Sequence, residues 1–163
     1  MRQKDDGAGG RAPKVSVLVA VHNAGPFLSP TLESVLAQSF QDFELIVIDD
    51  GSTDGCLAAA AAIADDRIAV LSQSRQGAPA ALNTGLRRAS GEFIAFLDHD
   101  DLWLPNKLET HLACFDAHPD ADLTFDWSLR IDKHGNDLGL PSSPWRGGIS
   151  FCLLYTSPSP RDS

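Results

Sequence analysis

Short apolar runs rich in β-branched residues alternate along this chain with segments whose apolar residues recur at helical spacing. The first run, residues 15–21, reads Val-Ser-Val-Leu-Val-Ala-Val and is apolar on both faces, which is typical of a buried strand in a parallel sheet. Strands that alternate with helices through short connections form βαβ units with right-handed crossovers. The alternation therefore predicts an α/β fold with a mostly parallel sheet.

The remaining elements follow from the same periodicities and from the Pro and Gly residues at helix ends. Pro79 suits the first position of a helix and Gly91 ends that helix, while Pro105 opens the next one. Further strands are predicted at residues 44–49, 68–71, 93–97 and 123–125, and helices at residues 27–39, 57–64, 79–90 and 105–118.

Both ends of the chain depart from the alternating pattern. Residues 1–13 are polar, rich in glycine and end in Pro13, so they are expected to be a flexible leader. Residues 152–163 show neither period, and prolines at 158 and 160 disfavour a helix or a central strand there. This segment is similar to translated read-through of a sequencing adapter, so we expect a non-native tail. The folded domain is therefore predicted at residues 14–151.

Composition excludes several classes of protein. The chain is 43% hydrophobic and 21% charged, as globular proteins are, and its apolar runs are far shorter than the ~20 residues of a membrane-spanning helix. Thirteen Lys and Arg against 22 Asp and Glu give a net charge of −9, which argues against nucleic acid as a partner. A polyanionic ligand would therefore need a metal ion or a local basic group.

Polar clusters follow three of the predicted strands. His22 and Asn23 come after the first, residues 49–54 (Asp-Asp-Gly-Ser-Thr-Asp) after the second, and residues 98–101 (Asp-His-Asp-Asp) after the fourth. Because ligands of open α/β sheets bind outside the carboxyl ends of the strands, the three clusters are expected to share one site. The carboxylates of Asp98 and Asp100 are a pair of oxygen donors that suits Mg²⁺ or Mn²⁺ together with substrate phosphates.

Other phosphate-binding classes fit the sequence less well. No G-x-x-x-x-G-K-[ST] loop is present, and the glycines at 7, 9 and 10 precede the first strand instead of following it. A non-catalytic phosphoacceptor receiver domain also gathers acids at strand ends and stays open as the alternative function, although its paired acids would follow the first strand, where His22 and Asn23 stand. A phosphatase with Asp98 as nucleophile would carry that motif on the first strand and not on the fourth.

The motifs, taken together and in order, resemble the amino-terminal half of family 2 glycosyltransferases. They are the run at 15–23, Ser34-Val-Leu-Ala-Gln38, Asp49-Asp-Gly-Ser-Thr-Asp54, Gly77-Ala-Pro-Ala-Ala-Leu-Asn83 with Gly85, and the segment from Gly91 to Asp101. The resemblance covers residues 14–137. It implies a Rossmann-like GT-A fold, truncated at the C-terminus, and transfer of a sugar from a nucleoside-diphosphate-sugar donor to an acceptor hydroxyl with inversion, as in cell-wall or polysaccharide biosynthesis.

Matched position by position, the resemblance implies a role for each cluster. Asp50 would be the partner of the nucleobase. The adjoining wall of the nucleotide site would be formed by Ala20, Val21, His22 and Asn23. Asp98 would contact the ribose, and Asp98 with Asp100 would hold Mn²⁺ or Mg²⁺ on the diphosphate.

Two departures from the family pattern shape the remaining expectations. Leu82 stands where the family often has Arg, so Arg75 or Arg87 would have to meet the donor phosphates. Nothing after Asp137 matches the family's catalytic base or acceptor-binding motifs, so the catalytic residues are left unassigned and the chain is expected to be an inactive amino-terminal fragment. The parent enzyme is expected in the cytoplasm or at the inner face of a membrane, with a saccharide, lipid-linked or protein acceptor.

Overall fold

The computed structural model describes residues 11–126, 128–132, 134–141 and 153–154. The chain divides between Asn106 and Lys107 into two units. Most of the expected leader lies outside the described residues, as does the expected tail apart from Leu153 and Leu154. No helix in the described part of the chain is both long and apolar enough to cross a lipid bilayer.

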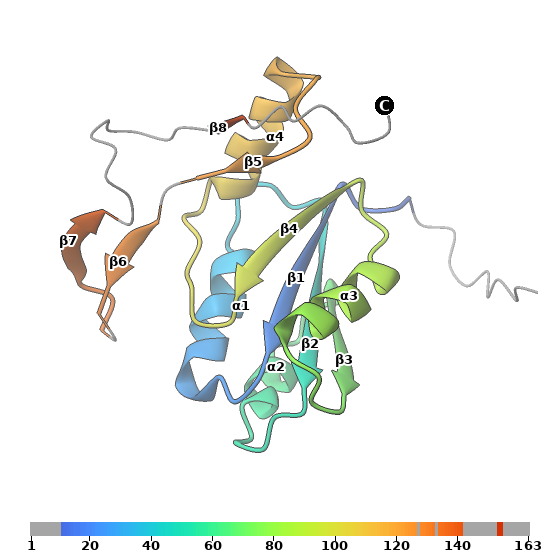
Figure 1. The fold of residues 1–163 in the computed structure, drawn as a ribbon, viewed down its shortest axis with the longest axis vertical. Coiled ribbons are helices and arrows are strands. Elements are labelled where there is room, and N and C mark those ends of the chain that lie inside the picture. Colours follow the sequence, from blue (N-terminus) through green and yellow to red (C-terminus); the bar gives the residue numbers. More distant parts are fainter. Residues whose placement is uncertain (1–10, 127, 133, 142–152, 155–163) are drawn as a thin grey trace, which may run out of the picture. The chain divides into compact units, whose positions relative to one another are not determined.

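Four parallel strands form the sheet of the first unit (Figure 1). They are β1 (Val15–Val21), β2 (Phe43–Asp50), β3 (Ile68–Gln73) and β4 (Phe93–Asp98), in the order β3-β2-β1-β4. Every neighbouring pair is parallel, which confirms the predicted α/β fold. The most apolar strand, β1, lies inside the sheet between β2 and β4.

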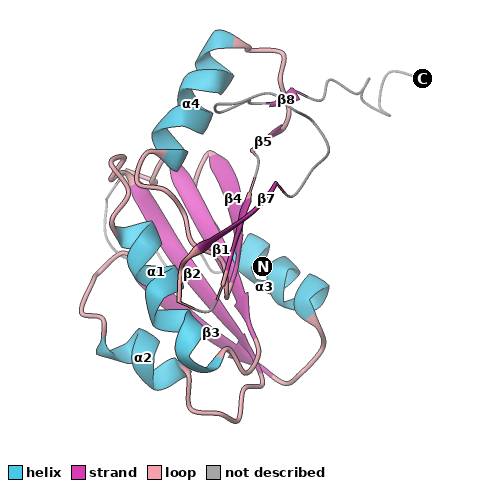
Figure 2. Ribbon diagram, turned by 90° about the vertical axis from the view of Figure 1, so that its left-hand side faces the viewer, coloured by secondary structure: helices cyan, strands magenta, loops and turns pink. Residues whose placement is uncertain are grey.

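Helices connect these strands and cover both faces of the sheet (Figure 2). The short 3₁₀ helix η1 (Gly25–Phe27) leads into α1 (Leu28–Leu36), and α2 (Leu57–Ala62) and α3 (Ala78–Arg88) follow β2 and β3. α1 and α2 lie on one side of the sheet, and α3 lies on the other. The second helix ends two residues earlier than predicted, because the backbone becomes extended at Ile63, with φ −82° and ψ 107°.

Side chains on both faces of β1 are buried, as its unbroken apolar run predicts. A buried hydrophobic cluster that includes a residue of α3 is formed by Leu18, Ile46, Ile48 and Ala81. Gly85 lets α3 approach this cluster closely, since a Cβ there would lie 2.7 Å from Ile48 Cδ1. Val17 and Val19 point to the opposite face, because side chains alternate along a strand, and are fully buried as well. The sheet therefore has an apolar core above and below its interior strands.

The strand register brings the polar clusters to one edge of the sheet. Val21 at the end of β1 is level with Asp49 of β2, and Ala20 is level with Asp98 of β4. The segments that follow β1, β2 and β4 therefore leave the sheet side by side at its carboxyl edge, as the sequence predicted.

The second unit begins with a helix and continues in short antiparallel strands. It contains α4 (Lys107–Ala117), β5 (Thr124–Phe125), β6 (Leu129–Ile131), β7 (Asp137–Pro141) and β8 (Leu153–Leu154). β5 pairs with β8 and β6 pairs with β7, both in antiparallel fashion. The helix and β5 agree with the predicted elements, whereas the other three strands were not predicted, and β8 lies within the expected tail.

Asp132 closes the hairpin between β6 and β7. Its Oδ1 accepts hydrogen bonds from the backbone N–H groups of His134 (2.8 Å) and Asn136 (2.9 Å), and Gly135 takes a left-handed φ of +83°. A hydrogen bond from the Asn136 side chain, together with these backbone bonds, lowers the pKa of Asp132 below its usual range. The described strand residues beside this turn are exposed, so they lack the alternation of buried and exposed positions by which a strand is predicted.

Candidate functional site

The candidate site lies at the carboxyl edge of the parallel sheet in the first unit. Hydrogen bonds join the segment after β1 to the segment after β2. Asn23 donates its backbone N–H to Ser52 Oγ (3.1 Å) and accepts at Oδ1 from the backbone N–H of Thr53 (2.8 Å). Asn23 has a left-handed φ of +52°, which Asn tolerates better than most residues other than glycine. The side-chain oxygen of Asn23 is therefore used in a hydrogen bond within the protein, and Asn23 holds the two segments together.

Two protein contacts orient the His22 ring. Nδ1 lies 2.9 Å from the backbone carbonyl oxygen of Asp50, and because a carbonyl only accepts, Nδ1 carries the proton. Nε2 is then the acceptor, 3.2 Å from Nδ2 of Asn23. The half-buried His22 ring is thus held in one orientation next to Asp50.

Asp50 is almost fully buried, with 3% of its surface exposed, and its carboxylate binds the connection between β3 and α3. Oδ1 accepts hydrogen bonds from Gln73 Nε2 and from the backbone N–H of Gln76, both at 2.8 Å, and Oδ2 accepts one from the N–H of Gly77 at 2.7 Å. The Gln73 bond, with those from Gln76 and Gly77, outweighs burial and lowers the pKa of Asp50 below its usual range. A carboxylate has about four acceptor positions, so these three bonds leave one position on Oδ2 that they do not use.

The chain next to Asp50 passes close to Arg75. Gly51 has a φ of +72°, and a Cβ at this position would lie 3.0 Å from the backbone nitrogen of Arg75, so both the conformation and the space favour glycine. Arg75 is exposed at this edge. Arg87 lies in the last turn of α3, which runs back to the amino edge of the sheet, and it donates to Thr84 Oγ1 (2.8 Å). Of the two arginines expected for donor phosphates, Arg75 is the one beside the site.

Asp98 and Asp100 differ from Asp50 because they are exposed. The N–H of Asp101 donates to the carbonyl of Asp98 (3.1 Å), which closes a turn at the end of β4. Within the described part of the chain, no Lys or Arg forms an ion pair with Asp98 or Asp100. His99 Nδ1 lies 3.6 Å from Asp100 Oδ1 and is buried without a hydrogen-bond partner among the described residues.

These two carboxylates fit a hard divalent cation. Mn²⁺ and Mg²⁺ prefer oxygen ligands, and Mg²⁺ is commonly held by one or two carboxylates together with substrate phosphates. The described residues contain no group of three or more His, Cys, Asp or Glu side chains that could hold a metal ion. A cation held by Asp98 and Asp100 would need further ligands, which substrate phosphates and water supply to Mg²⁺ in other sites.

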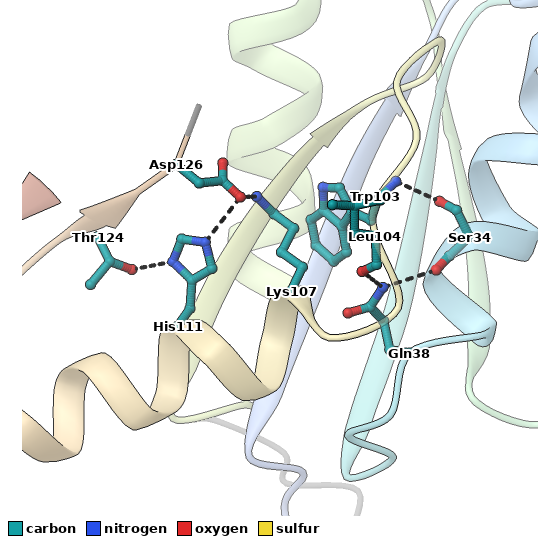
Figure 3. A network of polar contacts seen from close by, with 8 residues as sticks. All are labelled: Ser34, Gln38, Trp103, Leu104, Lys107, His111, Thr124 and Asp126. Carbon is teal, nitrogen blue, oxygen red and sulfur yellow. Dashed lines mark hydrogen bonds and ion pairs between the residues drawn. The ribbon is translucent and has the colours of Figure 1, made fainter. Parts of the chain in front are cut away.

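Thr31 and Ser34 of α1, together with Gln38 two residues beyond its end, hold the backbone of the segment that follows Asp98, an arrangement that was not predicted. The contacts join Thr31 Oγ1 to the carbonyl of His99 (2.9 Å), Ser34 Oγ to the N–H of Trp103 (3.1 Å) and Gln38 Nε2 to the carbonyl of Leu104 (2.7 Å). The contacts of Ser34 and Gln38 are drawn in Figure 3. Thr31 and Ser34 are three positions apart, so they lie on one face of α1. Gln38 follows the C-terminus of the helix. The feature of the sequence that could have revealed these contacts is the presence of polar residues among the buried apolar positions of α1.

The other positions expected at the site contribute less. Val21 is 1% exposed, so its side chain belongs to the core and only its backbone can line the edge. Ala20 is half-buried at the end of β1. Leu82 packs against the buried cluster around Leu18, which accounts for an apolar residue at this position.

A separate polar network lies within the second unit (Figure 3). Asp126 Oδ2 accepts a hydrogen bond from Lys107 Nζ (2.5 Å) and lies 3.2 Å from His111 Nε2, while His111 Nδ1 lies 2.6 Å from Thr124 Oγ1. Burial acts to raise the pKa of Asp126, but the hydrogen bonds from His111 and Lys107 and the charge of Lys107 lower it to about 2. The network was not predicted, because its partners lie 13 to 19 positions apart.

Comparison with known proteins gives a family match over most of the chain. Residues 16–151 match the family described as Glycosyl transferase family 2. The chain is 42% identical over 100 residues to UDP-Glc:alpha-D-GlcNAc-diphosphoundecaprenol beta-1,3-glucosyltransferase WfgD of Escherichia coli, which covers 61% of this chain and 40% of that protein. The chain spans 33% to 54% of the lengths of the first curated relatives that it matches.

Solved structures agree with the sequence comparison. TarS 1–349 of S. aureus, in complex with UDP-GlcNAc, matches with a TM-score of 0.62 and 28% identity over 73% of this chain and 34% of that one. The mannosyltransferase PcManGT of Pyrobaculum calidifontis, in complex with GDP-Man and Mn²⁺, matches with a TM-score of 0.60 and 30% identity over 68% and 34%. These likenesses confirm the predicted GT-A fold. With its parallel sheet, its acidic edge and its family match, this chain belongs to Glycosyl transferase family 2.

Proposed function

We propose that this chain forms the nucleotide-sugar-binding part of a metal-dependent glycosyltransferase that transfers a sugar to an acceptor hydroxyl with inversion. The observation that carries the proposal is the arrangement at one sheet edge of a buried, hydrogen-bonded Asp50 and the exposed carboxylates of Asp98 and Asp100. Family membership supports it, as do structural neighbours that were solved with UDP-GlcNAc and with GDP-Man and Mn²⁺.

The nucleoside is proposed to bind where the segments after β1 and β2 are braced together. Asp50 accepts a hydrogen bond from the base at its remaining acceptor position on Oδ2. The rigid wall beside it is formed by the backbone of Val21, by Ala20 and by the mutually bonded side chains of His22 and Asn23. Because these groups are already held by protein contacts, little ordering is needed when the nucleotide binds.

The diphosphate is proposed to lie nearer Asp98 and Asp100. The chain has a net charge of −9, so a diphosphate beside exposed carboxylates is repelled unless a cation lies between them. When bound, Mn²⁺ or Mg²⁺ neutralises the developing charge of the departing diphosphate. Asp98 and Asp100 hold this cation, Asp98 also contacts the ribose, and Arg75 serves as the basic partner of the phosphates.

The proposal assigns donor binding to this chain and assigns the general base to none of the described residues. The relative WfgD carries a diphosphoundecaprenol-linked acceptor in its name, which favours a lipid-linked saccharide among the acceptor classes expected from the sequence. The expected cytoplasmic location, at the inner face of a membrane, belongs to the same proposal. The receiver-domain alternative is set aside, because the chain belongs to family 2 and β1 is followed by His22 and Asn23 in place of paired acids.

Isothermal titration of the 163-residue chain with UDP and with GDP, each with and without MnCl₂, tests the proposal. We expect Mn²⁺ to strengthen binding of at least one nucleotide by more than about tenfold, or about 1.4 kcal/mol. Asp100→Asn should remove most of this gain, because an amide does not neutralise a cation as a carboxylate does.

A matched control is Asp66→Asn, which removes the same charge from an exposed position at the amino end of β3, on the opposite edge of the sheet. This variant should keep the full gain from Mn²⁺. Metal-independent binding of equal strength in the wild type and in Asp100→Asn would contradict the proposal.

A further inference from the structure

The segment between Asp98 and Asn106 has no helix or strand, yet its backbone is bound at four positions. Three of the contacts come from the side chains of Thr31, Ser34 and Gln38 described above. The fourth is a hydrogen bond of 2.7 Å from the N–H of Ser39, just beyond α1, to the carbonyl of Pro105. The loop is therefore fastened to the α1 region at its start, at His99, and at its end, over residues 103–105.

Two of these polar side chains, those of Thr31 and Gln38, are buried. Thr31, on a helix that also buries Leu28, Leu32 and Val35, is 0% exposed, and Gln38, two residues beyond that helix, is 1% exposed. A buried hydroxyl or amide is destabilising unless it is hydrogen-bonded, so apolar residues would serve the packing of α1 better. The carbonyls of His99 and Leu104 supply the missing partners. The loop therefore supplies the acceptor for the Thr31 hydroxyl and one of the two acceptors for the Gln38 amide.

The three side chains are also connected to one another through backbone carbonyls of α1. Ser34 Oγ donates to the carbonyl of Thr31 (2.7 Å), and Gln38 Nε2 donates to the carbonyl of Ser34 (3.1 Å) as well as to Leu104. Ser34 and Gln38 each contact both a carbonyl of α1 and the loop, and Thr31 binds the loop and is contacted by Ser34. The three side chains hold the loop as one connected set.

We propose that Thr31, supported by Ser34 and Gln38, is a positioning residue for the cation site at Asp98 and Asp100. This inference rests on the proposed function. The carbonyl of His99 belongs to the peptide that leads into Asp100, so the bond from Thr31 holds the backbone between the two carboxylates. Like charges drive such carboxylates apart, and a held backbone limits their separation before the cation binds. Loss of the bond weakens cation binding and leaves the nucleoside end intact.

The test is Mn²⁺ binding, followed by the electron paramagnetic resonance signal of free Mn²⁺, in the full chain saturated with UDP or GDP, whichever the wild type binds. Thr31→Val removes the hydroxyl at nearly constant size, and Thr31→Ser keeps it. We expect Thr31→Val to weaken Mn²⁺ affinity about tenfold and Thr31→Ser to stay within about twofold of the wild type. Nucleotide affinity without metal should be unchanged in both variants.

The outcomes separate this inference from the proposed function. Absence of Mn²⁺-dependent nucleotide binding in the wild type overturns the proposed function and the inference with it. Wild-type binding together with an unchanged Mn²⁺ affinity in Thr31→Val overturns the inference alone. Equal weakening of nucleotide binding with and without metal shows a structural role only, and this also overturns it.

A second variant covers the case in which Thr31→Val does not fold. Gln38→Met removes the donor to the Leu104 carbonyl and keeps a side chain of similar length. Because Leu104 lies farther from Asp100 than His99 does, we expect a smaller loss of Mn²⁺ affinity, about threefold, with unchanged metal-free binding. An unchanged Mn²⁺ affinity in folded Gln38→Met would show that Gln38 does not help to position the loop. If Thr31→Val also fails to fold, this result overturns the inference.

Discussion

The nucleoside end of the site, around Asp50, and the cation end, around Asp98 and Asp100, are built in opposite ways. The Asp50 carboxylate is buried and accepts three hydrogen bonds from the protein. At the cation end the carboxylates are exposed, and the protein holds the loop backbone through Thr31 and its neighbours instead. A carboxylate that accepts one hydrogen bond from a ligand can have its other acceptor positions filled by the protein before the ligand binds. Carboxylates that bind a cation must instead keep their oxygens free of hydrogen bonds to the protein.

Disruption of the nucleoside end should have the largest effect. Asp50→Asn puts an amide N–H where Asp50 now accepts from Gln73 Nε2 and from the backbone N–H groups of Gln76 and Gly77, so at least one donor faces another donor. We expect the largest fall in thermal midpoint of any single substitution named here, together with loss of UDP or GDP binding. Differential scanning fluorimetry and isothermal titration measure both.

Asp98→Asn is the matched variant at the cation end. Without metal it should leave the thermal midpoint unchanged, because the Asp98 carboxylate is exposed. Binding of pyrophosphate with Mn²⁺ should fall in Asp98→Asn and persist in Asp50→Asn. An equal loss of stability in the two variants would remove the contrast between the two ends.

The turn beside Asp50 provides a sharper and smaller test. Gly51 and Gly55 both have a left-handed φ, +72° and +78°, so an Ala at either position costs about 1 to 2 kcal/mol. Only at Gly51 does a Cβ meet a neighbour, the backbone nitrogen of Arg75 at 3.0 Å. We expect Gly51→Ala to lower the urea midpoint more than Gly55→Ala and to weaken nucleotide binding, which Gly55→Ala should preserve. Equal midpoints would mean that the approach of Arg75 is unimportant.

The smallest expected effect is on the pH dependence of stability and comes from Asp126 in the second unit. Like Asp50, Asp126 accepts hydrogen bonds from other residues of the protein. Its pKa is about 2 in the folded chain against an ordinary value of 3.8. A lowered carboxyl pKa adds stability above the ordinary value, and this stability is lost as the pH falls toward the folded value. Its side chain is 43% exposed, so solvent screens the effect.

Urea midpoints measured between about pH 7 and pH 3 should fall more steeply in the wild type than in Asp126→Asn. Nucleotide binding at neutral pH should be the same in both proteins. A parallel pH dependence would show that the bonds from Lys107 and His111 contribute nothing measurable to stability.

Local patterns were enough to predict the first unit. The apolar run of Val15–Val21 predicted a strand buried on both faces. Because the strands of a parallel sheet end at the same edge, the acids at the ends of β2 and β4 were predicted to lie at that edge. The second unit was harder, because its strands are short and the described residues of β6 are all exposed. The functional roles of Asp50, Asp98 and Asp100 stay predictions until binding is measured.

By itself the sequence determined the succession of strands and helices in the first unit, their apolar faces and the family, because hydrophobic period and turn-forming residues act over a few positions. The tertiary structure alone decided which carboxylate is satisfied inside the protein and which is left open. The partners of Asp50 lie 23 to 27 positions away, and the carbonyl bound by Thr31 lies 68 positions away. Such bonds depend on which backbone groups the packed sheet brings to one edge, and no pattern within a few residues specifies that.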